Sequence, residues 1–304
     1  MDEEELRCYV KAGEIAARVR EYAAHIVRPG MKIIELVENV ENKIRELGGQ
    51  PAFPCNVSIN YEAAHRTALI NDELSIPDDS VVKIDVGVHI NGYIADTAVT
   101  VSFNPKYEDL LNAVELALSK ALNVVGNGVR FIEIGKIVEE TLKSHGFKPI
   151  KNLSGHSLDR FIIHAGESIP NHKDILSMKK FKAGKAYAIE PFGTDGKGYV
   201  EEHNLITIYA LWKTGKIKGL SANEKKLLDA IRSRFKTLPF SERWLVDVFN
   251  NDIVLLRNTL ERLWKKRIIW GYPILVEASR GMVAQFEHTV VVLEKEVIVT
   301  TKLK

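Results

Sequence analysis

The 304-residue sequence has little cysteine, no long apolar run and almost no net charge. Its two cysteines, Cys8 and Cys55, form no CxxC pair and lack zinc-ligand spacing, which favours a reduced, intracellular and cytoplasmic protein. The acidic start MDEEELRCYV lacks the apolar segment of a signal peptide. No stretch of about 18 apolar residues is present, so we expect no membrane span. With 42 lysines and arginines against 40 aspartates and glutamates, the chain as a whole is no polycation.

The stretch VVKIDVGVHINGYIADTAVTV, residues 81–101, predicts a β-hairpin that carries two carboxylates. Its NG dipeptide favours a two-residue type I′ turn, because alternating apolar residues flank it on both sides. This turn fixes a register in which Gly87 pairs with Asp96. Since side chains alternate with period two, Asp85 and Asp96 then share one face of the hairpin, roughly 5–8 Å apart.

Two readings of this pair stay open from the stretch alone. Two carboxylates this close repel each other unless they share a proton or a cation, which indicates a cation site. The other reading is a pair of surface aspartates on a solvated face, opposite a buried face that contains Ile84 and Val86. Gly87 has no side chain to separate Asp85 from Asp96, and we expect it to leave room for a metal ion.

The chain contains an internal repeat of helical pairs. Helical spacing of apolar residues predicts helices over about 3–27, 33–47, 105–125 and 131–145. A shift of 98 residues aligns the first pair with the second, including Gly30 with Gly128. The strand KIDVG, which carries Asp85, has a looser counterpart in AIEPFG, which carries Glu190. We therefore expect a pseudo-symmetric α+β domain with a site between its halves, each half donating a carboxylate from a strand.

Residues 209–275 differ in composition from the rest of the chain. Residues 212–270 contain 14 lysines and arginines but only 6 aspartates and glutamates, which gives a net charge of +8. Spacing predicts three helices, over about 222–235, 241–249 and 252–266. An apolar strand at 268–270 and a turn at 271–273 follow, so the order resembles a winged helix. The segment is either a nucleic-acid-binding module or a solvated basic surface on an inserted helical lobe, because no pattern here specifies base readout.

Five residues of metal-binding type stand at strand ends or glycine-marked turns: Asp85, Asp96, His156, Glu190 and Glu287. Four carboxylates and one imidazole suit Mn²⁺, Fe²⁺, Co²⁺ or Zn²⁺, and a site with this many carboxylates can hold two ions. Each residue alone is a weak signal, since a single histidine or glutamate is more often structural. Alternation in the last strands, about 282–301, places Gln285 and Thr289 on the same face as Glu287.

The order of these residues and the motifs around them resemble the creatinase-fold metallopeptidases and, more narrowly, the archaeal form of the type 2 methionine aminopeptidases. The motifs are AFP (52–54), AAH (63–65), IDVG (84–87), SGHS (154–157), IHAGESIP (163–170), AIEPF (188–192) and AQFEHT (284–289). The similarity covers essentially the whole chain. It implies a pseudo-two-fold pita-bread domain formed by 1–208 and 276–304, with 209–275 as an inserted helical, winged-helix-like subdomain.

The resemblance also implies the parts of the active site. Asp85 would chelate one of two divalent ions (Co²⁺, Mn²⁺, Fe²⁺ or Zn²⁺), Asp96 and Glu287 would bridge the pair, and His156 and Glu190 would hold the other. A water activated by the ions would attack the scissile carbonyl. The remaining family positions are the catalytic and substrate-binding histidines, which stabilise the tetrahedral intermediate, and an aromatic residue of the methionine pocket: His65, His164 and Phe53.

The activity implied is cotranslational removal of the initiator methionine from nascent polypeptides with a small second residue. We expect a monomer, with ribosome contact through the basic segment and no membrane association. Ile208 stands near the place where some members carry another pocket histidine. Two alternatives remain: an X-Pro dipeptidase, which usually lacks the 97-residue gap between Glu190 and Glu287, and a non-catalytic binding protein, whose ligand positions would be lost.

Overall fold

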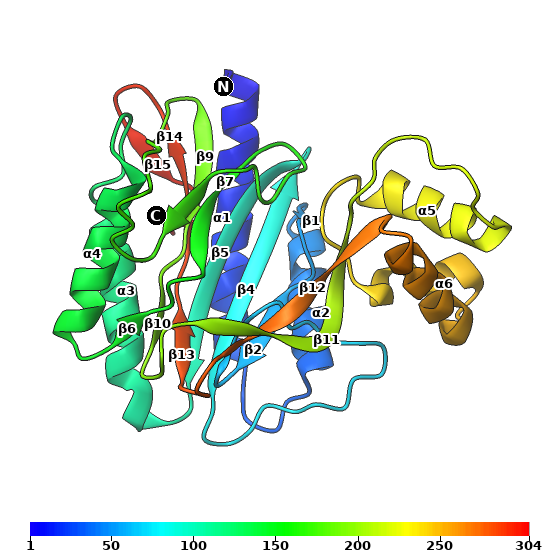
Figure 1. Cartoon of the computed structure of the whole chain (residues 1–304), viewed down its shortest axis with the longest axis horizontal. Helices are drawn as coiled ribbons and strands as arrows, with labels where there is room; N and C mark the ends of the chain where they lie inside the picture. Colours follow the sequence, from blue (N-terminus) through cyan, green and yellow to red (C-terminus); the bar gives the residue numbers. More distant parts are fainter. Residues whose placement is uncertain (304) are drawn as a thin grey trace.

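The computed structural model describes residues 1–303. Two helical pairs pack against a set of sheets, and a smaller helical lobe with α5 and α6 lies to one side of them, at the right of Figure 1. The helices are α1 (Glu3–Ile26), α2 (Ile33–Glu46), α3 (Glu108–Leu122), α4 (Phe131–Ser144), α5 (Ala222–Arg234) and α6 (Ile253–Lys265), with 3₁₀ helices η1 (Pro105–Tyr107) and η2 (Glu242–Phe249). Among these residues no helix combines the length and apolar character needed to cross a membrane.

The strands are mostly short, apart from two long pairs. They are β1 (Gln50–Pro51), β2 (Asn56–Ile59), β3 (Glu62–Ala64), β4 (Val81–Ile90), β5 (Tyr93–Ser102), β6 (Lys148–Pro149), β7 (Ser154–Leu158), β8 (Ser168–Pro170), β9 (Lys185–Ile189), β10 (Phe192–Thr194), β11 (Val200–Leu211), β12 (Ile269–Glu277), β13 (Val283–Gln285), β14 (His288–Val292) and β15 (Val297–Val299). The long pairs are β4 with β5 and β11 with β12.

The hairpin of β4 and β5 has the predicted register, with Gly87 opposite Asp96. Asn91 and Gly92 both have positive φ, 54° and 92°, as a type I′ turn requires. Of the two readings left open for the second face, the solvated one is wrong. One face packs on α1 and α2, and the other, which includes Ile94, is buried against residues from the second half of the chain.

The internal repeat is visible in the backbone hydrogen bonds that precede the second helix of each pair. Gly30 N–H donates to the carbonyl of Ile76 (2.8 Å), and Gly128 N–H donates to the carbonyl of Phe181 (2.9 Å). Both glycines have positive φ, 78° and 82°, which residues with a Cβ rarely adopt. Each helical pair has its own apolar core, so the two halves are alike in packing as well as in sequence.

The lobe formed by η2, α5 and α6 has a separate core that includes Leu227, Phe240 and Leu256. Ser221 caps α5 as predicted, in a capping box with Glu224. Two details differ from prediction. The middle helix is a 3₁₀ helix, and 271–273 is no turn, because β12 runs through it as the partner of β11. Pro273 lies where the β11–β12 register shifts, so its missing N–H disturbs no regular ladder there. The winged-helix likeness stays a prediction.

Candidate metal centre and active site

One cavity of about 370 Å³ collects every site residue expected from the sequence. These residues come from the loop before β2, the residue after β3, the β4–β5 hairpin, β7, and the turns that follow β7, β9 and β13. In that order they are Phe53, His65, Asp85 with Asp96, His156, His164, Glu190 and Glu287. Part of the wall is apolar and part is a cluster of carboxylates. The cavity therefore joins a polar reaction centre to space for an apolar side chain.

The polar part centres on Asp96, His156 and Glu287, all buried, whose ligand atoms lie within 4.8 Å of one another. The Nε2 atom of His156 is 3.3 Å from Oε1 of Glu190 and 3.7 Å from Oδ2 of Asp96. Asp85 lies beside Asp96 on the same hairpin face, within hydrogen-bonding reach of it. Four carboxylates and one imidazole thus line the same part of the cavity.

This cluster is costly without cations, because its charges are out of water and face one another. Burial raises the pKa of Asp85 and that of Glu190 to about 8, and it raises the pKa values of Asp96 and Glu287 well above their usual range. One oxygen in each of Asp85, Asp96 and Glu287 is buried with no hydrogen-bond partner. Divalent cations would satisfy these atoms, and hard carboxylates with one imidazole are a donor set that suits them, so the residues present fit a metal centre.

Threonines hold Asp96 and Glu287 side by side, although one comes from the first half of the chain and the other from the second. The Thr97 hydroxyl donates to the backbone carbonyl of Glu287 (2.7 Å), and the Asp96 N–H donates to the hydroxyl of Thr289 (2.7 Å). The guanidinium of Arg20, in α1, donates to the Thr97 hydroxyl (2.7 Å). These buried hydrogen bonds, the one from Arg20 charge-assisted, fix the spacing of the segments that carry the ligands.

His65 has an unusual backbone and a defined tautomer. Its φ is 68°, in the left-handed region that non-glycine residues seldom occupy and that often marks functional sites. Its Nδ1 lies 3.2 Å from the carbonyl of Pro273. Because a carbonyl only accepts, Nδ1 carries the proton and Nε2 is left as an acceptor. Burial lowers the pKa of His65 to about 4, so the ring is neutral at physiological pH.

His164 lies between the metal cluster and the apolar wall. Its ring packs edge-on against His156, with ring centroids 4.5 Å apart, and tilted against Tyr272, at 6.1 Å. Although its side chain is exposed to solvent, desolvation by the protein packed around the ring lowers its pKa to about 3, which keeps it neutral with one N–H to donate. A neutral donor next to the cluster is suited to an oxygen on which negative charge develops.

Several residues that line the cavity were not predicted as members of the site, among them Tyr272 and Gln285, and one expectation was wrong. Tyr272 packs edge-on against His65, with ring centroids 5.3 Å apart; reading 271–273 as a turn concealed it. Gln285 donates to Glu190 (3.4 Å), and its place on the face of Glu287 was the signal that could have found it. The gap at Gly87 is filled by the ring of Phe53 and not by metal, because a Cβ there would lie 2.2 Å from the ring.

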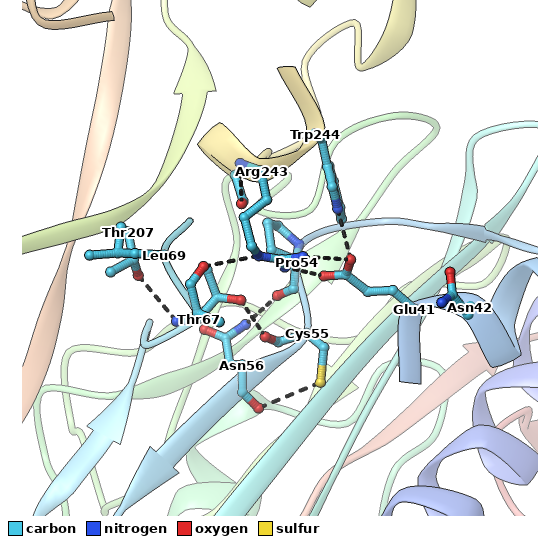
Figure 2. A network of polar contacts seen from close by, with 12 residues as sticks. Glu41, Asn42, Pro54, Cys55, Asn56, Thr67, Leu69, Thr207, Arg243 and Trp244 are labelled. Carbon is cyan, nitrogen blue, oxygen red and sulfur yellow. Dashed lines mark hydrogen bonds and ion pairs between the residues drawn. The ribbon is translucent and has the colours of Figure 1, made fainter. Parts of the chain in front are cut away.

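The basic lobe also contributes to the cavity, through Pro239, and a buried ion pair fixes its position (Figure 2). Arg243, in η2, donates to both carboxylate oxygens of Glu41 in α2 at 2.7 and 3.3 Å. Trp244 Nε1 donates to the same carboxylate (2.8 Å), and Arg243 Nε donates to the carbonyl of Ala68 (3.0 Å). These hydrogen bonds therefore anchor the lobe to the domain that carries the metal-binding residues.

The sequence is similar to those of known metallopeptidases over nearly its whole length. A family model described as metallopeptidase family M24 matches residues 7–294. The chain is 46% identical over 302 residues to a methionine aminopeptidase of Saccharolobus solfataricus, covering 99% of each chain. It is 46% identical over 293 residues to a methionine aminopeptidase of Methanocaldococcus jannaschii, covering 96% of this chain and 97% of the relative. The family fits the carboxylate cluster, because its members are metalloenzymes.

Solved structures agree on the fold. Methionine aminopeptidase from Thermotoga maritima superposes with a TM-score of 0.71 at 21% identity, covering 100% of this chain and 98% of that one. A thermophilic Arx1 superposes with a TM-score of 0.84 at 17% identity, covering 100% and 92%. At such identities the likeness shows the fold alone, and it confirms the predicted pita-bread architecture. With the family match and the near full-length relatives, the chain belongs to metallopeptidase family M24 as an archaeal-like type 2 methionine aminopeptidase, a hydrolase of the metalloaminopeptidase class.

Proposed function

We propose that the protein removes the N-terminal methionine from newly made polypeptides that have a small second residue. The observation that carries the proposal is the cavity in which four carboxylates, two of them fully buried, and a buried histidine adjoin an apolar wall. The closely related methionine aminopeptidases support the same activity. A methionine side chain gains roughly 1.5–3 kcal/mol on transfer to such a wall, and its thioether packs well against aromatic rings such as that of Phe53.

The proposed ligand roles are those that the resemblance to the family implies. Asp85, Asp96, His156, Glu190 and Glu287 would hold two divalent ions, with Asp96 and Glu287 shared between them. When bound, such ions supply a water nucleophile at neutral pH and polarise the scissile carbonyl. The unpartnered oxygens of Asp85, Asp96 and Glu287 support this assignment. Co²⁺, Mn²⁺, Fe²⁺ and Zn²⁺ all suit the donor set.

The two histidines divide the work on the substrate. His65, with its proton held on Nδ1 by Pro273, accepts at Nε2 from the peptide N–H that follows the scissile bond. His164 is neutral and lies against His156, so it donates to the carbonyl oxygen as that oxygen gains negative charge. Both contacts orient the peptide, and Phe53 limits the side chain that fits beside them.

We also propose a cytoplasmic monomer that acts during translation. In this proposal, 1–208 and 276–304 form the catalytic domain and 209–275 the inserted subdomain, which contacts the ribosome. The separate core of the lobe formed by η2, α5 and α6 supports this division, and the excess of basic residues in the lobe supports contact with an anionic surface.

The test is hydrolysis of Met-Ala-Ser by the protein loaded with Co²⁺ or Mn²⁺. We expect release of free methionine by the wild type and by Asp79→Asn, an exposed control, and none by Asp96→Ala. Met-X-Ser peptides with a larger second residue should be poor substrates, and an Ala-Pro dipeptide should not be cleaved. Equal turnover by wild type and Asp96→Ala would exclude the proposed centre, and a preference for Ala-Pro would indicate an X-Pro dipeptidase.

A further inference from the structure

Three of the four tryptophans of the chain lie exposed at one edge of the basic lobe. Trp212 is 67% exposed, Trp264 43% and Trp270 50%. Trp212 follows the end of β11, Trp264 lies in the last turn of α6, and Trp270 is in β12. Large aromatic side chains are normally well buried, so three gathered in solvent mark a surface that binds something.

The three side chains line a common groove of about 460 Å³. Trp212 and Trp270 are diagonal neighbours across the β11–β12 pair, since Ala210 pairs with Trp270 and Trp212 N–H donates to the carbonyl of Ile268 (2.9 Å). Their ring centroids are 5.9 Å apart and their planes are tilted by 37°. Two rings held this way by paired strands give a rigid apolar platform with little side-chain entropy left to lose.

The rim of the groove is cationic. Lys265 and Arg267 line it together with the tryptophans, and Lys213, next to Trp212, is also exposed. Lys265 is paired with Glu261 (2.6 Å), whereas within residues 1–303 neither Arg267 nor Lys213 forms an ion pair. The groove therefore combines flat aromatic surfaces with positive charge available to an anionic ligand.

We propose that this groove binds single-stranded RNA, with unpaired bases stacked on the tryptophans and phosphates held by Arg267 and Lys213. Every nucleobase has a flat face, so aromatic platforms beside basic residues bind single strands with little sequence preference. A duplex offers phosphates but no free base faces. The choice of RNA rests on the proposed action on newly made chains, which places the lobe beside ribosomal RNA.

This proposal differs from the general basic surface expected of the lobe, because it names the contact. A surface that attracts RNA by charge alone would need no exposed tryptophan, and it would bind duplex and single strand alike. A groove for a proline-rich peptide would use the aromatic rings but gain nothing from the cationic rim. The two features together fit a nucleotide, which has a ring and a phosphate.

The experiment uses full-length, metal-loaded protein titrated with a fluorescein-labelled single-stranded oligoribonucleotide. We expect binding seen by anisotropy, with quenching of tryptophan fluorescence, because Trp244 alone lies outside the groove, bonded to Glu41. Trp212→Ala and Trp270→Ala should each weaken binding roughly 5- to 150-fold, and the phenylalanine variants should weaken it less. Arg267→Glu should lower the salt dependence by about 0.7 in log–log slope for the lost phosphate contact.

Matched controls separate this site from the peptidase site. Lys225→Ala changes an exposed lysine of α5 outside the groove and should leave RNA affinity within about twofold. Hydrolysis of Met-Ala-Ser should be the same in all these variants, so loss of peptidase activity and loss of RNA binding are scored independently. RNA binding unchanged by Trp212→Ala and Trp270→Ala, or equal affinity for duplex and single strand, would overturn the proposal. So would quenching by a proline-rich peptide but not by RNA, or a clear preference for single-stranded DNA.

Discussion

Replacing Glu41 by alanine should destabilise the protein far more than loss of an ordinary ion pair. The side chain of Glu41 is 2% exposed and that of Arg243 is 7% exposed, so the substitution leaves a buried guanidinium without its counterion. Breaking a buried pair in this way costs about 3–5 kcal/mol, and the unpaired N–H of Trp244 adds to this loss. The control is Glu46→Ala, which breaks the surface pair with Lys43 and should cost about 1 kcal/mol or less.

The measurement is the free energy of unfolding from urea titration of Glu41→Ala, Arg243→Ala and the double variant. Because the double variant leaves no uncompensated charge, its loss should be smaller than the sum of the single losses by about 0.5–3 kcal/mol. The Michaelis constant for Met-Ala-Ser should rise in Glu41→Ala, because the lobe that carries Pro239 into the cavity loses its anchor. If the losses of the two single variants are additive, or if either single variant loses less than about 1 kcal/mol, the Glu41–Arg243 pair does not anchor the lobe.

Three further predictions concern the cavity itself. Without divalent metal the free energy of unfolding should fall as pH rises from about 6.5 to about 8, because the folded state keeps protons on Asp85 and Glu190 that the unfolded chain has released, while the histidines with lowered pKa values are neutral in both states. Urea titrations with EDTA or Mn²⁺ test this: Mn²⁺ should stabilise more at the higher pH, and greater metal-free stability at pH 8 would contradict it. His164→Ala should lower kcat on Met-Ala-Ser by about 10²–10³-fold with metal content unchanged, and a change in KM alone would show a binding role only. Gly87→Ala should displace the Phe53 ring, which a Cβ would approach to 2.2 Å, and cost about 1–3 kcal/mol in stability with a higher KM; unchanged KM would show that the ring does not shape the pocket.

Local chemistry explains which parts of the fold were predictable. The hairpin register followed from Asn91-Gly92, because a two-residue turn leaves one alignment of the strands. The helical pairs followed from apolar spacing, and each ends within a few residues of its predicted bound. The strand through Pro273 could not be predicted, since only its distant partner β11 makes an extended conformation favourable there.

In the candidate site, too, local sequence predicted some residues, and others depended on distant contacts. Residue types and motifs identified the eight residues that the structure brings to one cavity, although their roles stay predictions until activity is measured. Sequence reasoning missed Tyr272, whose place depends on β12, and it took Gly87 for a space left to metal, whereas Phe53 fills that space. The Glu41–Arg243 pair joins segments about two hundred positions apart, which no local pattern connects.

The hydrogen bond from the Thr97 hydroxyl to the backbone carbonyl of Glu287 has a consequence for how the molecule assembles. Because the cluster takes Asp85 and Asp96 from the first half and Glu190 and Glu287 from the second, neither half forms the centre by itself. Contacts this distant in sequence form late and slowly during folding, since long loops must close before they gain anything. Metal uptake should accordingly be a late folding step, and recovery of metal affinity after dilution from urea should lag behind recovery of helix content.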